Sequence, residues 1–252
     1  MDNRRFYEET AFDSWATRSG LTEVETALFS RFLDRRRSTL EAGTGAGRIL
    51  FGLQERGFGD LHGFDYVPGF IDIARRRDRS GSIELSVQDA VDLDYPDGRF
   101  EQAIYVQQIL CFIEDPAARS RAMREASRVL RPGGLALFSF LCFESRNSRA
   151  PFAAFTRYLR LQRRLRRRDV SPQYQPWLMA GAKPNLGALA DRAPYVYWYR
   201  VDEALDSLAE VGFAVTWAGS TKQIVDPASG RDARQLDRSR LDGMLYVVCR
   251  RT

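Results

Sequence analysis

The segment 38–50, STLEAGTGAGRIL, places three glycines at alternate positions between an apolar run and a helix-like run. A glycine-rich turn between a strand and a helix lets the backbone approach a bound nucleotide closely. A phosphate-binding loop would need the pattern GxxxxGK[ST], which this turn lacks. A dinucleotide loop would need a third glycine where Arg48 stands. The acid before the turn, Glu41, suits a ligand with a cationic amino group and disfavours a pyrophosphate.

Around this turn, strand-like and helix-like patterns alternate along the chain as far as residue 142. We expect strands at 38–42, 60–65, 82–90, 100–110 and 135–141, and helices at 47–58, 68–81 and 115–134. Residues 5–33 also have helical periodicity, and after an irregular stretch we expect a helix at 201–212 and strands at 213–220 and 243–250. Such alternation predicts a parallel sheet covered by helices on both faces.

The turn LEAGTGAGR resembles motif I of the class I S-adenosylmethionine-dependent methyltransferases. Four later segments resemble further parts of that family in order and spacing: GFDYVPGFIDIAR, VQDAVDLDYPDGRFEQAIYVQQIL, REASRVLRPGGLALFS and YRVDEALDSLAEVGF. The resemblance covers residues 38–142 and 197–252. A lone GxGxG would be a weak signal, whereas five segments in the right order are a specific one.

The resemblance implies S-adenosylmethionine as cofactor and a set of residues that bind it. Asp65, at the end of the second strand, would bind the ribose hydroxyls, and Tyr66 would lie beside the adenine. Asp89 and Ala90 would meet the adenine edge, and Gln107 would lie under the bound cofactor. The full predicted set is Glu41, Gly43, Gly45, Gly47, Asp65, Tyr66, Asp89, Ala90 and Gln107.

Two positions depart from the family pattern. Glu41 stands where aspartate is commoner, and Glu101 follows Phe100 where the family usually has aspartate. Both changes are conservative, so neither puts the cofactor in doubt.

The implied fold is a single α/β domain with a Rossmann-like, doubly wound sheet of seven strands, the last of them antiparallel, and helices on both faces. Within residues 1–252 we expect an N-terminal helical region at 1–37 and a cofactor-binding core at 38–142. Residues 143–200 would be an insertion that caps the acceptor site, and 201–252 would supply the last helix and strands.

Methyl transfer from a sulfonium is an in-line displacement, so much of the catalysis can come from positioning. A general base is needed only when the acceptor must lose a proton. The single histidine, His62, enters the second strand far from the carboxyl ends where ligands bind, so it is a poor candidate. No catalytic residue is assigned; candidates by position are Gln107, Gln108, Glu144 and the tyrosines of 195–199.

Aromatic residues offer two interpretations. In an extended run, Tyr195, Tyr197 and Tyr199 face one side and Val196 and Trp198 the other. They either pack the insertion against the core or form an aromatic wall for an apolar or planar substrate. Tyr7 and Trp15 in the N-terminal region are similarly ambiguous. The candidate substrate residues are Tyr7, Trp15, Gln108, Glu144, Tyr195, Tyr197 and Trp198.

The formal net charge of +5 comes from one segment. Residues 157–168, RYLRLQRRLRRR, hold seven arginines and no acid, and the rest of the chain has 31 basic and 33 acidic residues. Together with the residues just before it, the segment reads as an amphipathic helix whose other face is arginine. Its apolar residues are Phe152, Phe155, Leu159 and Leu165, with Tyr158 and Leu161 alongside. It is either a lid helix with a solvated face or a binding site for an anionic substrate, a membrane surface or nucleic acid.

The remaining composition narrows the class of protein. The three cysteines are odd in number and form no CxxC pair, so neither a disulfide framework nor a metal site is indicated. No apolar run approaches the roughly 20 residues of a membrane span, and the first residues lack the apolar stretch of a signal peptide. We therefore expect a cytoplasmic enzyme that moves a methyl group from S-adenosylmethionine to an oxygen or nitrogen of a small molecule.

Two alternatives stay open. The chain could methylate RNA or DNA through residues 157–168, although it lacks the [DN]PP[YF] and Pro–Cys motifs of the base methyltransferases. It could also bind the cofactor without catalysis, since no base is evident.

Overall fold

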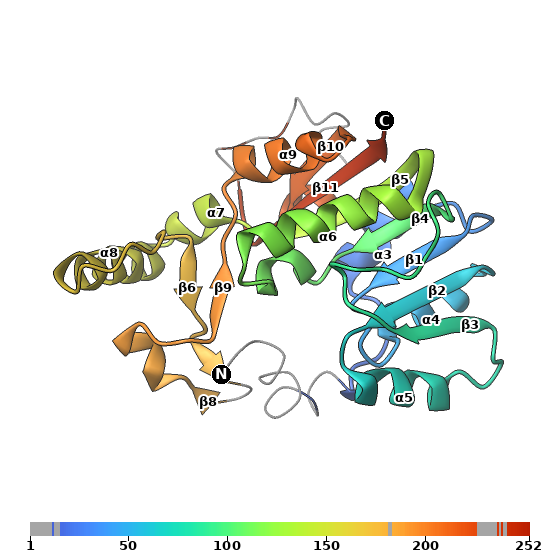
Figure 1. Cartoon of the computed structure of the whole chain (residues 1–252), viewed down its shortest axis with the longest axis horizontal. Coiled ribbons are helices and arrows are strands. Elements are labelled where there is room, and N and C mark those ends of the chain that lie inside the picture. The colour runs from blue at the N-terminus through green and yellow to red at the C-terminus, as the bar shows by residue number, and fades with distance from the viewer. Residues whose placement is uncertain (1–11, 13–15, 181–182, 226–235, 237, 239–240) are drawn as a thin grey trace.

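The computed structural model describes residues 12, 16–180, 183–225, 236, 238 and 241–252 (Figure 1). Its main sheet has seven strands in the order β10-β11-β5-β4-β1-β2-β3. The strands are β1 Thr39–Ala42, β2 Leu61–Asp65, β3 Ile83–Val87, β4 Phe100–Tyr105, β5 Leu130–Leu141, β10 Phe213–Ser220 and β11 Met244–Arg251. All run parallel except β11, which lies antiparallel between β5 and β10. The predicted seven-stranded sheet with an antiparallel last strand is confirmed.

Helices cover both faces of this sheet. They are α3 Glu23–Phe32, α4 Arg48–Gln54, α5 Pro68–Arg77, α6 Pro116–Val129, α9 Val201–Glu210 and α10 Thr221–Val225, with a 3-10 turn η2 at Ile109–Phe112. Side chains of β5 alternate between the faces, because successive residues of a strand point to opposite sides. Leu135 and Leu137 pack with residues of α3 and α4, whereas Ala136 and Phe138 pack with residues of α6 and α9. Figure 1 shows α6 and α9 together in front of the sheet.

Several element boundaries differ from the sequence-based expectation, because α4, α5 and β3 end three or four residues early, and the two largest differences have a physical reason. The fourth strand ends at Tyr105 rather than 110, because Gln107 and Gln108 have φ values of 60° and 61° and leave the extended conformation. The helix expected at 115–134 ends at Val129. Residues before a proline disfavour helical angles, so the chain around Pro132 enters β5 instead.

Residues 143–200 form a separate group of short elements, which we call the arm. They are α7 Phe143–Asn147, α8 Ala150–Leu165, β6 Tyr174–Pro176, β7 Met179–Ala180, β8 Lys183–Pro184, η3 Leu186–Ala190 and β9 Tyr195–Tyr197. β6 and β9 pair antiparallel, and α8 projects away from the main sheet (Figure 1). Among the described residues, no helix is both long and apolar enough to cross a bilayer.

The arm is organised around a buried ion pair. Arg163 of α8 donates from Nε and Nη2 to the two carboxylate oxygens of Asp191, at 2.9 and 2.7 Å. The same guanidinium donates to the carbonyls of Ser171 and Tyr174, and Arg168 donates to Asp191 at 3.1 Å. Burial raises the pKa of Asp191, but the hydrogen bonds and charges of the two arginines outweigh it and hold the pKa below its usual value. One carboxylate therefore joins α8, the following loop and η3.

Candidate active site at the carboxyl ends of the strands

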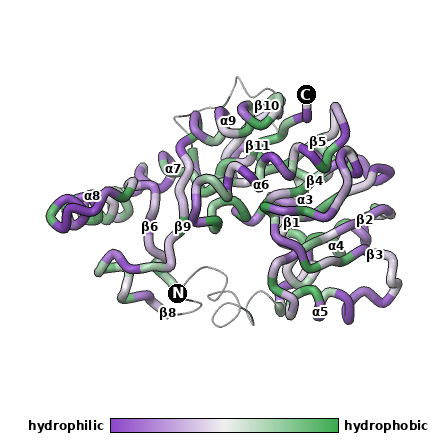
Figure 2. Tube along the Cα trace, in the orientation of Figure 1, coloured by the Kyte–Doolittle hydropathy of each residue, from purple (hydrophilic) through white to green (hydrophobic). Residues whose placement is uncertain are grey.

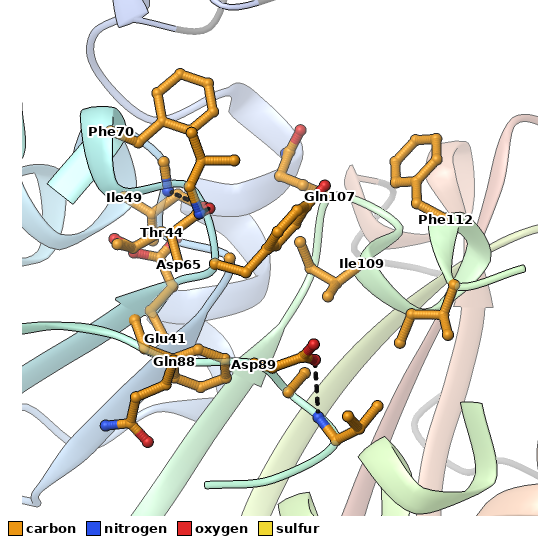
Figure 3. A pocket seen from close by; sticks show the side chains of 18 of the residues that line it. Glu41, Thr44, Ile49, Asp65, Phe70, Gln88, Asp89, Gln107, Ile109 and Phe112 are labelled. Atoms are coloured by element: carbon orange, nitrogen blue, oxygen red, sulfur yellow. Dashed lines mark hydrogen bonds between the residues drawn. The ribbon is translucent and has the colours of Figure 1, made fainter. Parts of the chain in front are cut away.

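A cavity of about 370 Å³ opens at the carboxyl ends of β1, β2, β3 and β4 (Figure 3). The strand order reverses between β1 and β4, which is where open α/β sheets bind ligands. All its lining residues lie between Glu41 and Ala118. The lining includes the predicted cofactor residues Glu41, Gly43, Gly45, Asp65, Tyr66, Asp89, Ala90 and Gln107.

Gly47 is the one predicted cofactor residue outside the cavity lining. It caps α4 with φ of 83° and no side-chain partner. A Cβ at this position would lie 2.7 Å from the Phe51 ring and 3.3 Å from Cβ of Ala74. This glycine therefore permits close packing of α4 and α5 behind the turn rather than contact with a ligand.

Asp65 fixes the turn from the end of β2. Its Oδ2 accepts from the Gly45 amide and its Oδ1 from the Val67 amide, both at 2.9 Å. The carboxylate is 6% exposed, and burial raises its pKa to about 6 despite these donors. It is therefore largely ionised at neutral pH. Asp65 lines the cavity, and each oxygen of a carboxylate can accept a second hydrogen bond, as from a ligand hydroxyl.

Glu41 is the second buried acid of the site. The Thr44 hydroxyl donates to its Oε2 at 2.6 Å. Burial raises the pKa of Glu41 to about 8, and the nearby acids Glu25 and Asp65 act in the same direction. A cationic group of a bound ligand would favour the ionised form, as the sequence predicted for an acid at this position.

Arg48 explains why the turn departs from a dinucleotide loop. Its guanidinium forms a two-pronged ion pair with Glu25 of α3, at 2.7 and 2.6 Å, and also donates to the Gly20 carbonyl. Gln107 donates to the same Glu25 carboxylate. In the sequence, Glu25 is recognisable only as part of a capping box with Thr22, which marks the start of a helix. Its contacts with Arg48 and Gln107 beside the cavity were therefore not predicted.

The segment after β3 forms another side of the cavity. The Asp89 carboxylate is exposed and accepts from the Val91 amide at 3.1 Å, while Ala90 is buried beside it (Figure 3). Gln88 and Val91 line the cavity as well and were not predicted. An exposed acceptor next to a small apolar residue suits the edge of a heteroaromatic ring.

The far wall is apolar and is made by the segment after β4. The left-handed pair Gln107–Gln108 turns the chain into η2, which places Ile109, Phe112 and Ile113 on the cavity (Figure 3). Left-handed angles in two successive non-glycine residues are uncommon and mark functional loops. The Gln108 amide, at 3.0 Å from Ser139 Oγ, helps to hold this turn. These wall residues were missed because the segment read as a continuing strand.

The predicted substrate residues that the structure describes do not line the cavity. Gln108 donates to Met244, and Glu144 accepts from the Val201 amide at 3.3 Å. Tyr197 donates to Glu203, Tyr195 donates to the Asp191 carbonyl at 2.6 Å, and Trp198 stacks under Arg146. Glu144 and Tyr197 thus join the arm to α9, Tyr195 and Trp198 contact residues within the arm, and Gln108 contacts β11. Tyr7 and Trp15 lie outside the described residues.

The arm supports the apolar wall from behind. Trp177 packs on Phe112 with ring centroids 5.0 Å apart. Arg119, which is buried, donates to the carbonyls of Ile113 and Glu114 at 2.8 and 3.0 Å and lies 3.9 Å over the Tyr197 ring. In the described part of the chain the arm thus braces the cavity without lining it.

His62 lies away from the cavity, as expected. It is buried in β2, its Nε2 is 2.7 Å from the Asp60 carboxylate, and its ring packs edge-on against Phe100.

Known proteins are similar to this chain in sequence and in fold. Residues 40–138, which hold every lining residue described above, match the profile of a methyltransferase domain. The fold resembles an S-adenosylmethionine-dependent methyltransferase from Methanosarcina mazei with a TM-score of 0.67, over 92% of this chain and 98% of the other. The matched segment spans less than half of this chain. Because the two sequences are only 18% identical, the similarity to the Methanosarcina mazei structure concerns the fold alone.

Curated relatives are similar in part of their length. A demethylmenaquinone methyltransferase of Thermus thermophilus is 34% identical over 98 residues, which cover 38% of this chain and 43% of the relative. The match therefore spans less than half of that protein. Among solved structures, the 1,6-didemethyltoxoflavin-N1-methyltransferase of Burkholderia thailandensis has a TM-score of 0.58 at 16% identity, over 99% of this chain and 87% of that one.

The site fits S-adenosylmethionine, the cofactor that the sequence resemblance implies. An acid at the end of β2 and a glycine turn on the cavity suit a ribose and an amino-acid tail. Asp65 would hold the ribose, and Glu41 with the turn would hold the cationic tail. Asp89 and Ala90 would meet the base.

The raised pKa of Glu41 predicts a pH-dependent gain in stability on its replacement. The folded pKa of about 8 exceeds the usual 4.5, so the folded protein holds a proton that the unfolded chain releases. The contribution of this group to stability is full below pH 4.5 and is lost as pH rises to about 8. Glu41→Gln removes this loss and can still accept from Thr44. We expect its melting temperature, relative to wild type, to be roughly 7–14 °C higher at pH 8 than at pH 5.

Differential scanning fluorimetry across that pH range measures the effect. Glu55→Gln, an exposed residue after α4, is the matched control and should run parallel to wild type. A parallel curve for Glu41→Gln would contradict a protonated Glu41.

Proposed function

We propose that this methyltransferase moves a methyl group from S-adenosylmethionine to an oxygen or nitrogen of a small molecule with an apolar body. The observation that carries the proposal is the division of the cavity. Its β1–β3 side holds the acids Glu41, Asp65 and Asp89 among apolar residues, whereas its far wall is mostly apolar, with Ile109, Phe112 and Ile113. A volume of about 370 Å³ lies within the usual range for small-molecule sites.

The chain's own contribution to the reaction is positioning and desolvation. When bound, S-adenosylmethionine supplies an electrophilic methyl group. Asp65 and Glu41 hold the donor from the turn, and the apolar wall holds the acceptor and excludes water. No histidine lines the cavity within the described ranges. An amine or an acidic hydroxyl, which need little help to lose a proton, is therefore the proposed acceptor group.

The names of similar proteins support a small ring-shaped acceptor. The curated relatives are named for demethylmenaquinone, and one structural neighbour binds 1,6-didemethyltoxoflavin. We further propose a reducing compartment such as the cytoplasm, since Cys111, Cys142 and Cys249 are all buried free thiols.

Two measurements together test the proposal. Isothermal titration calorimetry measures binding of S-adenosylmethionine, and transfer of a labelled methyl group is then followed with quinols, phenols and heteroaromatic amines. Binding with transfer to one of these classes is expected. Binding without transfer to any acceptor would instead favour a non-catalytic binding protein. Transfer to RNA or DNA alone would make it a nucleic-acid methyltransferase.

Replacement of the wall residue Phe112 separates the acceptor from the donor. Phe112→Ala removes an apolar surface that contacts the acceptor, so we expect KM for the acceptor to rise roughly tenfold. The Kd of S-adenosylmethionine should change less than about twofold. Phe112→Leu keeps an apolar side chain and should restore most of the affinity. An equal loss of affinity for donor and acceptor would contradict this assignment of the wall.

A further inference from the structure

Exposed large apolar side chains gather on the arm. Of the eight among the described residues, six lie there: Tyr158, Leu161, Leu165, Met179, Leu186 and Leu189. Leu165 and Leu186 are each 75% exposed. Apolar residues scattered singly need no explanation, but a cluster on one projecting element marks an interaction surface. Figure 2 shows apolar and polar residues close together along α8.

Five of these residues form one surface, which we call the arm patch: Tyr158, Leu161, Leu165, Leu186 and Leu189. The three residues of α8 are spaced i, i+3 and i+7 and therefore share a stripe. Leu186 and Leu189 are three apart in a 3-10 turn and share a side. The Tyr158 hydroxyl donates to the Leu189 carbonyl at 2.7 Å, so the two stripes adjoin.

A basic stripe borders the arm patch. Arg157, Arg160 and Arg164 are exposed at spacings i, i+3 and i+7 on α8, and two further exposed arginines follow the helix at 166 and 167. None of these five forms an ion pair within the part of the chain that the structure describes. The other two arginines of the segment form ion pairs with Asp191. Five positive charges without an ion-pair partner among the described residues thus lie beside exposed leucines.

We propose that the arm docks on a lipid bilayer whose surface carries anionic headgroups. A helix with an apolar stripe beside a basic one lies in the membrane interface, with its leucines at the acyl boundary and its cations on the phosphates. Tyr158, with an apolar ring and a polar tip, suits that boundary. The inference does not depend on the proposed methyl transfer, because the arm lines no part of the cavity among the described residues.

The exposed leucines of the arm patch favour a bilayer over water or nucleic acid. A lid helix facing water needs the arginines but gains nothing from leucines that are 57% and 75% exposed at 161 and 165. Nucleic acid would engage the arginines with aromatic or polar neighbours, not with leucine side chains. A bilayer uses both kinds of group at once.

Vesicle flotation of the full chain tests the proposal. The probes are phosphatidylcholine vesicles with and without 30% phosphatidylglycerol. Each exposed arginine near such a surface contributes about a fivefold gain in partition. We expect binding to the anionic vesicles only, reduced roughly 100-fold in Arg157→Gln/Arg160→Gln/Arg164→Gln. We expect at least a tenfold reduction in Leu161→Ser/Leu165→Ser.

Matched controls change the same charge and polarity elsewhere. Arg79→Gln/Arg121→Gln/Arg124→Gln removes three exposed arginines outside the arm, and Val225→Ser removes an exposed apolar residue. Both should bind vesicles as wild type does, and unchanged melting temperatures verify that the variants are folded.

Several results would overturn the proposal: no flotation, equal flotation with neutral vesicles, or equal losses in the controls. Salt-sensitive retention on nucleic acid without vesicle binding would assign the stripe to RNA or DNA. A dimer in solution that is lost in Leu161→Ser/Leu165→Ser, with no vesicle binding, would assign the patch to a second copy of the chain.

Discussion

Asp65→Ala is expected to weaken the binding of S-adenosylmethionine by roughly 100-fold or more. A carboxylate that accepts from two ribose hydroxyls contributes two charge-assisted hydrogen bonds, each of about 1.5–3 kcal/mol. The same substitution leaves the amides of Gly45 and Val67 without their acceptor, so the turn itself loses its fixed position. Isothermal titration calorimetry with the purified variant measures the loss directly.

Two further variants make this result specific. Asp72→Ala removes an exposed acid of α5, 59% accessible and 3.9 Å from Arg75, and should bind the cofactor as wild type does. Asp65→Asn keeps one acceptor oxygen and should fall between the other two. An equal loss in Asp65→Ala and Asp72→Ala would remove Asp65 from the cofactor site.

Asp191→Ala is expected to lower the free energy of unfolding by about 3–5 kcal/mol. The substitution leaves the Arg163 guanidinium, whose side chain is 3% exposed, without its counter-ion. Removing one partner of a buried ion pair costs far more than removing an exposed one, because the remaining charge stays out of water. Urea unfolding monitored by tryptophan fluorescence measures the change, and Asp72→Ala should leave the midpoint unchanged.

The double variant Arg163→Met/Asp191→Leu tests the cause. It replaces both charges with apolar side chains of similar size, so its loss should be clearly smaller than that of Asp191→Ala. If the double variant were less stable than the single one, the hydrogen bonds of Arg163 to the Ser171 and Tyr174 carbonyls would outweigh the cost of its unpaired charge.

The order of the core elements could be predicted because it depends on local signals. Glycines at 43, 45 and 47, the acid at the end of each early strand, and Pro68 at the start of α5 each report on their own neighbourhood. Eight of the nine predicted cofactor residues line one cavity. The same signals could not distinguish Gly47 from the other two glycines, because its role depends on how closely Phe51 and Ala74 pack against it.

The parts that escaped prediction depend on contacts between distant segments. Gln107 and Gln108 look like strand residues, and their left-handed angles are supported by Ser139 and Glu25, which lie 31 and 82 residues away. The tyrosine run behaved in the same way. Alternation correctly put Tyr197 and Tyr199 on one side, with rings 4.8 Å apart, but only the position of Arg119 decides that this side faces the core.

The two halves of the cavity are built from different materials, and this has an evolutionary consequence. Under the proposed function, the donor half is fixed by backbone amides that bond to Asp65, whereas the acceptor wall consists of the side chains of Ile109, Phe112 and Ile113. Substitutions of Phe112 and Ile113 would alter the shape of that wall and leave the bonds to Asp65 in place. Under that proposal, a lineage of this protein would exchange one acceptor for another by a few mutations while its use of the methyl donor stays constant.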